Sequence, residues 1–434
     1  MMRAVELPRS DLPSFLPSHS PTHNPTRTQR PHSPQQQLGL FLPSLRLPMR
    51  PLPSLLPILF ILLSCDAISA FHHHPRPATV TMASTTSGSS STTSAHPKVL
   101  GMGVTGIDLL AYVDAYPAPD AKIRTSDFKV QGGGNSGNTL TALSRLGVHA
   151  EIFTKVGDDA YGKMIVDELT ADGLDTHRVI RKTGISSPFT YVIVDTASQT
   201  RTCLHTPSED MTEEEITPDL LDGVDFLHLD GRNTLAAIKL ALLARERNIP
   251  VMLDAEKDRP HLKELVPLCD FLATNTAFPK TFTGAKSTEE GMAALLGLGK
   301  AKLIFTTLGA EGSMVMGRPE DMQRGGKESE GGRKEGLSLP LAMQESTYVC
   351  PVKGTTLMVT KCDAWPVEPK EIVDTTGAGD AFIAGLIYGL IHSWLVPRML
   401  VLGGFVAAQK LKGPGARAGL PRREAVPREV GLVE

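Results

Sequence analysis

Short apolar runs alternate with helical patterns from Lys98 onward, and this alternation restricts the fold more than any other feature of the chain. Short apolar runs of this length are typical of buried strands in a parallel sheet. Repeated strand–helix units predict an α/β fold with three layers, in which helices flank a mostly parallel sheet. We expect the strands of this sheet at 99–104, 150–155, 226–230, 250–254, 271–274 and 303–307, the last of which completes the series.

Residues 188–195 and 201–205 interrupt the alternation, because they resemble two strands on either side of the polar turn Ala197-Ser198-Gln199. This spacing predicts a hairpin rather than a βαβ unit. Together with the residues near Asp127–Val130, the hairpin is expected to form a small β-sheet lid. The lid would comprise about 123–131 and 186–206.

Residues 1–96 differ in composition from the predicted folded domain, 97–434. They are rich in Pro, Ser, Thr and His, and a segment with so little apolar surface to bury is expected to be disordered. Its apolar run Leu55–Leu63 is too short to cross a membrane and lies far from the start for a signal peptide. A transit peptide and translation from Met82 are the alternatives to a signal peptide, and these two predict a plastid or a cytoplasmic protein.

The charge balance and the cysteines exclude some classes of function. The chain has 44 Lys and Arg against 47 Asp and Glu, so no basic field supports binding to nucleic acid. Its 5 cysteines lack the paired spacing of a metal site and are typical of reduced residues in an intracellular protein. Residues 317–346 are rich in Gly, Glu and Lys and lack apolar periodicity, so we expect a solvated surface insertion there.

A glycine-rich stretch, Asp374-Thr375-Thr376-Gly377-Ala378-Gly379-Asp380-Ala381-Phe382, precedes an apolar run that ends at Ile391. The run predicts a buried helix that begins near Gly379. Amides at a helix start lack intrahelical partners and suit an anion, and the Asp380 carboxylate could take a proton from an alcohol beside them. These features together predict phosphoryl transfer to a hydroxyl group. For an isolated Gly-x-Gly-Asp, an ordinary helix start is the alternative.

A second glycine-rich turn, Gln131–Asn138, also lies between a short strand and a predicted helix. Three consecutive glycines beside Asn135 and Asn138 favour the close approach of a small polar ligand, with a purely structural loop as the alternative. Asp108 lies just beyond the first predicted strand, where ligand sites of α/β proteins usually form.

The two glycine-rich motifs together resemble those of the ribokinase-like (PfkB) family of carbohydrate and nucleoside kinases. The resemblance extends over about Lys98–Leu420. Within the family the chain is most similar to the ketohexokinases and their plant PfkB relatives, on His228–Asn233 and Asp254–Pro260. The resemblance implies a ribokinase-like fold and ATP-dependent phosphorylation of a sugar hydroxyl, with a ketohexose such as fructose as the leading acceptor.

Carried over by motif position, the resemblance implies a role for each group of residues. Asp380 would be the general base, and Gly377, Ala378 and Gly379 would supply the amides that face the transferred phosphoryl group. The residues implied for the sugar hydroxyls are Asp108, Gly134, Asn135 and Asn138. Those implied for ATP are Arg232, Gly309, Ala310, Glu311 and Gly312.

The resemblance also implies metal ions. Mg²⁺ would accompany ATP and neutralise its phosphates. Asp374 resembles a position that is tied to a monovalent cation such as K⁺ in parts of the family. Many relatives carry Asn-x-x-Glu where this chain has Asn275-Thr276-Ala277-Phe278, so the Glu is absent and no Mg²⁺ ligand is assigned. Asp380 is expected to have an ordinary pKa of roughly 4 and to be ionised at neutral pH.

Two alternatives to the ketohexose kinase hypothesis follow. The first is a kinase of ribose or of a nucleoside on the same scaffold. A nucleoside would need an aromatic or apolar wall, and Gly106–Asp108 and Gln131–Asn138 contain no aromatic residue, although Phe189 and Tyr191 lie in the lid. The second is a catalytically silent plastid scaffold protein, which would need neither the base nor the glycines. The expected partners are a small-molecule sugar and ATP, without nucleic acid or membrane, and a homodimer through the β lid is a further hypothesis.

Overall fold

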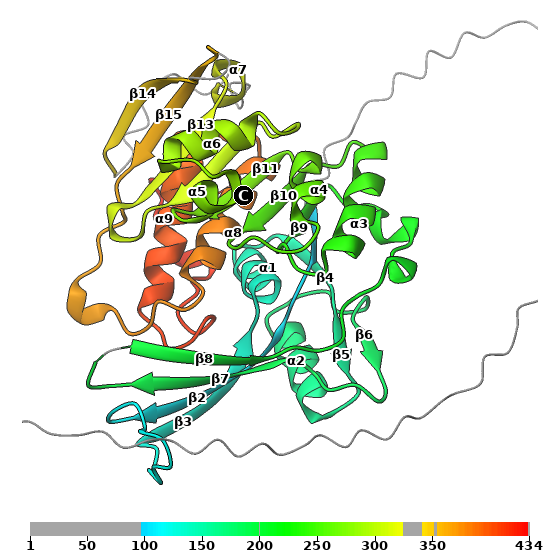
Figure 1. Ribbon diagram of the computed structural model, residues 1–434, viewed down its shortest axis with the longest axis vertical. Helices are drawn as coiled ribbons and strands as arrows, with labels where there is room; N and C mark the ends of the chain where they lie inside the picture. The colour runs from blue at the N-terminus through cyan, green and yellow to red at the C-terminus, as the bar shows by residue number, and fades with distance from the viewer. Residues whose placement is uncertain (1–96, 199, 324–340, 351–353, 433–434) are drawn as a thin grey trace, which may run out of the picture. The chain divides into compact units, whose positions relative to one another are not determined.

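The computed structural model of the protein describes residues 97–432, except 199, 324–340 and 351–353 (Figure 1). The predicted leader 1–96, with the alternative start at Met82, lies outside the described residues, as does the centre of the predicted insertion.

A nine-stranded sheet with the order β14-β15-β13-β12-β11-β10-β9-β1-β4 forms the middle layer. Its strands from β4 to β12 pair in parallel, in agreement with the alternation of strands and helices in the sequence. The predicted three-layer α/β architecture is therefore confirmed. The parallel strands are β1 (Lys98–Met102), β4 (His149–Phe153), β9 (Phe226–Leu229), β10 (Val251–Ala255), β11 (Phe271–Asn275) and β12 (Leu303–Thr307).

The strand series does not end at Thr307, so that part of the prediction is wrong. Three antiparallel strands extend the sheet, namely β13 (Ser313–Gly317), β15 (Thr356–Cys362) and β14 (Met343–Val349). They escaped prediction because β13 is joined to β12 by the tight turn Leu308–Gly312, and because β14 is mostly exposed and polar. The short helix α7 (Pro319–Met322) and the start of β14 lie inside the boundaries of the predicted insertion.

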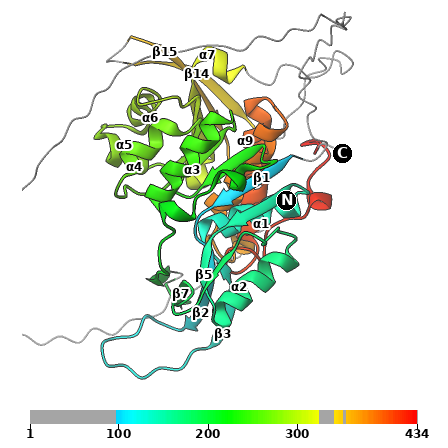
Figure 2. The same cartoon turned by 90° about the vertical axis from the view of Figure 1, so that its right-hand side faces the viewer.

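Two apolar clusters cover the two faces of the main sheet. Neighbouring strand residues alternate between them: Val99 packs in one cluster and Leu100 in the other. Figure 2 shows α1 and α9 on one side of the sheet, with α3, α5 and α6 on the other. No helix in the described part of the chain combines the length and the apolar character that a membrane crossing requires. The helices are α1 (Asn135–Arg145), α2 (Ala160–Ala171), α3 (Thr234–Glu246), α4 (Leu262–Leu265), α5 (Phe278–Thr283), α6 (Thr288–Leu296), α8 (Ala378–Ile391) and α9 (Val396–Leu411).

The predicted lid is a separate four-stranded sheet with the order β3-β2-β7-β8 (Figure 1). The hairpin of β7 (Phe189–Asp195) and β8 (Thr200–Thr206) is confirmed, and β3 (Asp127–Gly133) joins it through β2 (Gly106–Val113). The sequence predicted Asp108 in a loop directly after β1, and this placement is wrong. Because β2 belongs to the lid, Asp108 lies within a lid strand. A short pair, β5 (Lys155–Gly157) and β6 (Ile180–Lys182), forms a third sheet.

The pairing register gives the lid two different faces. One row across the strands, Gln131–Asp108–Thr190–His205, is polar. The adjacent row, Val130–Leu109–Tyr191–Leu204, points to the opposite face and is apolar. Of the apolar row, Val130, Tyr191 and Leu204 are exposed to solvent.

Candidate active site

The carboxyl ends of the parallel strands meet the start of α8 at one edge of the main sheet. Asp254 lies near the end of β10, Glu256 follows this strand, and Asn275 ends β11. These three residues and Asp380 line a small cavity of about 90 Å³. Ligands of open α/β sheets bind at this edge, which supports the position of the predicted site.

The start of α8 leaves backbone amides free for an anion. Gly377 precedes the helix with φ 76°, and a β-carbon there would lie 2.9 Å from that of Ala416, so glycine is required on both counts. Among the described residues, no acceptor bonds the N–H groups of Gly379 and Asp380. A β-carbon at Gly379 would meet only open space, which leaves the backbone accessible to a ligand. Free amides of this kind suit an anion, which is the role that the sequence predicts for this helix start.

The carboxyl group of Asp380 is buried in the first turn of α8 and only 7% exposed. Burial raises its pKa to about 7, although the hydrogen bond from Asn138 lowers it, and the charge of Glu256 raises it further. The expectation of an ordinary pKa is therefore wrong, because the sequence does not reveal how completely the folded chain covers this group. A carboxylate with a pKa near the working pH is well suited to act as a general base.

A chain of buried hydrogen bonds leads from Asp380 to an arginine near the C-terminus. Asn138 Nδ2 donates to Asp380 Oδ2 at 2.7 Å, and Arg417 Nε donates to Asn138 Oδ1 at 3.0 Å. Both ends of the Asn138 amide therefore already bond protein groups. The Arg417 guanidinium also donates to Thr105 Oγ1 at 3.2 Å and to the Gly133 carbonyl at 2.8 Å. These bonds hold Asn138, and through it the carboxylate of Asp380, in one orientation.

The glycines of the first glycine-rich turn make room for this arginine. A β-carbon at Gly132 or Gly137 would overlap the Arg417 guanidinium, and one at Gly133 would overlap the Asp108 carboxylate. At these three positions, glycine is therefore needed to make room for the side chains of Arg417 and Asp108, and not only for a ligand.

The residues predicted for the sugar lie around this turn. Asn135 Nδ2 donates to Asp254 Oδ2 at 3.0 Å, so Asn135 lies beside the small cavity. Gly134 precedes α1 with φ 90°. Burial raises the pKa of Asp108 to about 6, while Arg417 and a hydrogen bond from Thr190 lower it. The structure thus brings Asp108, Asn138 and Asp380 together around Arg417, whereas Asn135 lies beside Asp254.

A cavity of about 570 Å³ adjoins the start of α8 on its other side. Gly309, Ala310 and Gly312 from the turn after β12 line it, together with Gly379. Its remaining walls are mostly apolar and include Trp365, Val367, Ile372, Phe382 and Leu411. An apolar wall that faces free amides suits a nucleotide, with the base on the wall and the phosphates on the amides. Glu311, which was predicted for the same site, is exposed and does not line the cavity.

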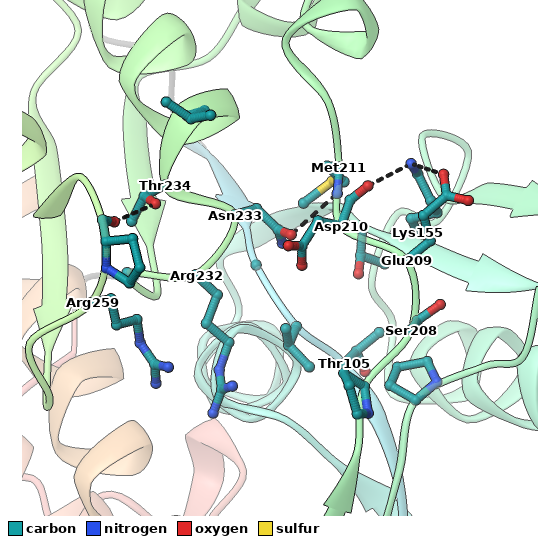
Figure 3. Close-up of a pocket in the computed structure, with 18 of the residues that line it drawn as sticks. Thr105, Lys155, Ser208, Glu209, Asp210, Met211, Arg232, Asn233, Thr234 and Arg259 are labelled. Atoms are coloured by element: carbon teal, nitrogen blue, oxygen red, sulfur yellow. Dashed lines mark hydrogen bonds and ion pairs between the residues drawn. The ribbon is translucent and has the colours of Figure 1, made fainter. Parts of the chain in front are cut away.

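Arg232 lines a different cavity, of about 380 Å³, between the lid and the end of β9 (Figure 3). Arg259 lies beside it, and the two guanidinium groups extend in the same direction (Figure 3). Within the described residues neither guanidinium has a hydrogen bond or an ion pair, and each faces the other's positive charge. Their charges are therefore available to an anionic ligand. Lys155 is not, because it is paired with Glu209 and Glu215.

One group of side chains has the spacing of a metal site in the part of the chain that the structure describes. It consists of Glu151, Asp175 and His177. The carboxylate of Glu151 is fully buried and already paired with Lys98 and Arg178. Since two cations neutralise it, we assign no metal there.

The sequence reasoning missed three residues of the site. Arg417 lies in the loop Gly413-Pro414-Gly415-Ala416-Arg417. Lys410, whose ammonium donates to the carbonyl of Asp374, follows Gln409 in the last turn of α9. The signal for Lys410 was a single lysine in a mostly apolar helix, and the signal for Arg417 was the glycine-rich loop that follows this helix. Arg259 had only its place in the motif Asp254–Pro260 as a signal, since nothing in the sequence brings it beside Arg232.

Similarity to known proteins extends over most of the residues that the structure describes. A family model described as "pfkB family carbohydrate kinase" matches residues 97–327 and 352–423. The bifunctional ribokinase/ribose-5-phosphate isomerase A of Fructilactobacillus sanfranciscensis is 22% identical over 345 residues, which cover 76% of this chain and only 55% of that relative. Ketohexokinase of Mus musculus is 23% identical over 325 residues, which cover 72% of this chain and 95% of the relative.

Solved structures show the same fold. The structure of Arabidopsis thaliana ribokinase complexed with ribose and ATP superposes with a TM-score of 0.61 at 18% identity. The match covers 78% of this chain and 100% of that one.

Proposed function

The chain belongs to the PfkB family of carbohydrate kinases, and on this premise we propose that it transfers the γ-phosphoryl group of ATP to a hydroxyl of a free ketohexose such as fructose. The observation that carries the proposal is the pairing of the buried base Asp380 with the free amides of Gly379 and Asp380 at one helix start. Phosphoryl transfer requires mainly this kind of positioning and charge stabilisation.

In this mechanism the acceptor hydroxyl lies against the Asp380 carboxylate and gives up its proton as the new O–P bond forms. The amides at the start of α8 face the equatorial oxygens of the transferred group, and Arg232 with Arg259 supplies positive charge on the side of the lid. Asn138 keeps the carboxylate oriented toward the hydroxyl. The adenine base lies in the apolar cavity beside Trp365.

Mg²⁺ fits the carboxylates at the end of β10. Burial and the charges of Glu256 and Asp380 raise the pKa of Asp254, a repulsion that a bound cation would relieve. Asp254 and Glu256, which line the small cavity with Gly379, would hold the ion. They would thereby take the place of the Glu that is absent after Asn275. When bound, Mg²⁺ neutralises charge on the ATP phosphates.

Two features favour a free sugar over a nucleoside as the acceptor. The cavity beneath the lid has no Phe, Tyr or Trp in its lining, so a base would find no aromatic wall there. Asn135 and Asp108 offer short polar groups, which suit the closely spaced hydroxyls of a polyol. Ribose is the alternative acceptor, because two of the relatives above are described as ribokinases.

We expect a free sugar to be the preferred acceptor in competition assays with fructose, ribose, adenosine and cytidine. Asn135→Ala should raise KM for the sugar roughly tenfold with little change in KM for ATP, since a hydroxyl loses its buried partner. Asn138→Ala is the matched variant and should act mainly on kcat, because Asn138 contacts the base. A nucleoside with far higher kcat/KM than every sugar would reject the ketohexose assignment in favour of a nucleoside kinase.

The protein is also proposed to form a homodimer through the lid. Phe128, Val130, Tyr191 and Leu204 are exposed on neighbouring lid strands, and such apolar patches mark interaction surfaces. Sedimentation of the wild-type protein should report a dimer, and Leu204→Glu should shift it to a monomer. A wild-type protein that sediments as a monomer at micromolar concentration would contradict this proposal.

A further inference from the structure

Lys410 is a buried cation that the proposed mechanism does not use. Its side chain is 0% exposed near the end of α9. The ammonium donates to the carbonyl of Asp374 at 2.7 Å and to the carbonyl of Gly413 at 3.2 Å. Burial lowers the pKa of Lys410 to about 8, so the charged form still predominates at pH 7.

The side chain of Asp374 is likewise occupied by protein donors. Its Oδ1 accepts from the N–H and the hydroxyl of Thr376 at 2.8 and 2.7 Å, and from Arg201 of the lid at 3.1 Å. Its Oδ2 accepts from the N–H of Gly415 at 2.8 Å. Although burial raises the pKa of Asp374, these bonds and the charge of Lys410 hold it below the ordinary value.

These contacts do not fit the monovalent cation that the family resemblance attaches to Asp374. A K⁺ ion binds through carbonyl and carboxylate oxygens that replace its hydration shell. Here both carboxylate oxygens accept bonds from protein N–H or O–H groups, and the Asp374 carbonyl faces an ammonium. A second cation beside Lys410 would also meet like-charge repulsion.

We propose that the Lys410 ammonium is a built-in cation which orders the phosphoryl-transfer loop, so that this chain needs no K⁺ at Asp374. Asp374 begins the loop that leads to Gly377 and Gly379, whereas Gly413 begins the loop that leads to Arg417. The ammonium bonds the first residue of each loop, and Gly377 packs directly against Ala416 of the second loop. Lys410 is therefore a positioning residue for both the amides and the Arg417–Asn138–Asp380 chain.

The test compares the full-length protein with Lys410→Ala and with Lys412→Ala in KCl, NH₄Cl or tetramethylammonium chloride at equal ionic strength. Lys412 is exposed two residues further along and is paired with Glu371, which makes it the matched control. The wild type and the control should have the same kcat in all three salts within about twofold. Lys410→Ala should lose roughly tenfold or more in tetramethylammonium, because two buried charged bonds are missing, and K⁺ or NH₄⁺ should restore part of that loss.

The thermal midpoint without substrates is the second measurement, and it does not depend on the proposed activity. The midpoint of the wild type should not respond to K⁺, whereas that of Lys410→Ala should rise with K⁺ if the ion enters the vacated site. Strong activation or stabilisation of the wild type by K⁺ would overturn the inference, even if Lys410→Ala fails to fold. A folded Lys410→Ala whose defect no cation relieves would overturn it as well.

Discussion

Asp380→Asn is expected to lower kcat by about 10²–10⁴-fold, the range typical of the loss of a general base, while the fold and the affinity for ATP stay close to those of the wild type. The amide cannot accept the proton of the acceptor hydroxyl. It can still accept the hydrogen bond from Asn138 Nδ2 through its oxygen. Burial raises the pKa of Asp380 in the folded protein above its value in the unfolded chain. The folded state therefore loses stability as the pH rises above the unfolded pKa and the buried carboxyl group ionises. Because the amide of Asp380→Asn stays neutral, the thermal midpoint of the variant at pH 7 should equal or exceed that of the wild type.

Asp167→Asn is the matched control for this experiment. Asp167 is exposed on α2 and paired with Lys163 one helical turn away, so its loss should leave kcat and the thermal midpoint almost unchanged. Steady-state rates with ATP and fructose, together with ATP titration of each purified variant, provide the comparison. Near-normal turnover in Asp380→Asn would remove this residue from the role of base.

Arg417→Met is expected to destabilise the protein by about 3–5 kcal/mol, the cost typical of removing one partner from a buried charged network. The substitution removes the buried donor of Asn138 Oδ1 and leaves the Gly133 carbonyl with the longer bond from Thr105 Oγ1, at 3.3 Å. It should also change the pH dependence of catalysis. The wild-type kcat/KM should rise with pH through about 7 as Asp380 ionises, and because the charge of Arg417 lowers this pKa, the midpoint should shift upward in the variant.

Urea unfolding and a pH profile of kcat/KM measure the two effects separately. Arg417→Lys keeps the charge but not the planar fork, so it should fold better than Arg417→Met and shift the midpoint less. Arg247→Met removes a surface arginine that is paired with Asp222, and it should change neither quantity. An unchanged midpoint in a folded Arg417→Met protein would show that the arginine does not act on the base.

The general architecture was accessible from the sequence because it depends on local patterns. Alternating strand and helix periods predicted the parallel sheet, and the polar turn at Ala197–Gln199 predicted the lid hairpin. The strand β14 was missed because an exposed strand at a sheet edge lacks the apolar run that identifies a buried strand. The buried strands β13 and β15 were missed because they pair antiparallel and do not follow the alternation of strands and helices. Asp108 was expected in a loop after β1 but lies in β2 of the lid, because only three residues, Gly103–Thr105, connect the main sheet to the lid.

The two glycine-rich motifs and the base Asp380 were likewise predictable, because a tight turn before a buried helix and a carboxylate in its first turn are signals within one short stretch. The sequence by itself therefore determined the fold class and the kinase family, and it predicted the proposed anion site and base. Only the tertiary structure decided how these parts are held. It showed that Arg417 fills the space left by Gly132 and Gly137, that burial raises the pKa of Asp380, and that Lys410 joins two loops. Burial and long-range hydrogen bonds depend on residues hundreds of positions apart, and no local pattern encodes which of them will meet.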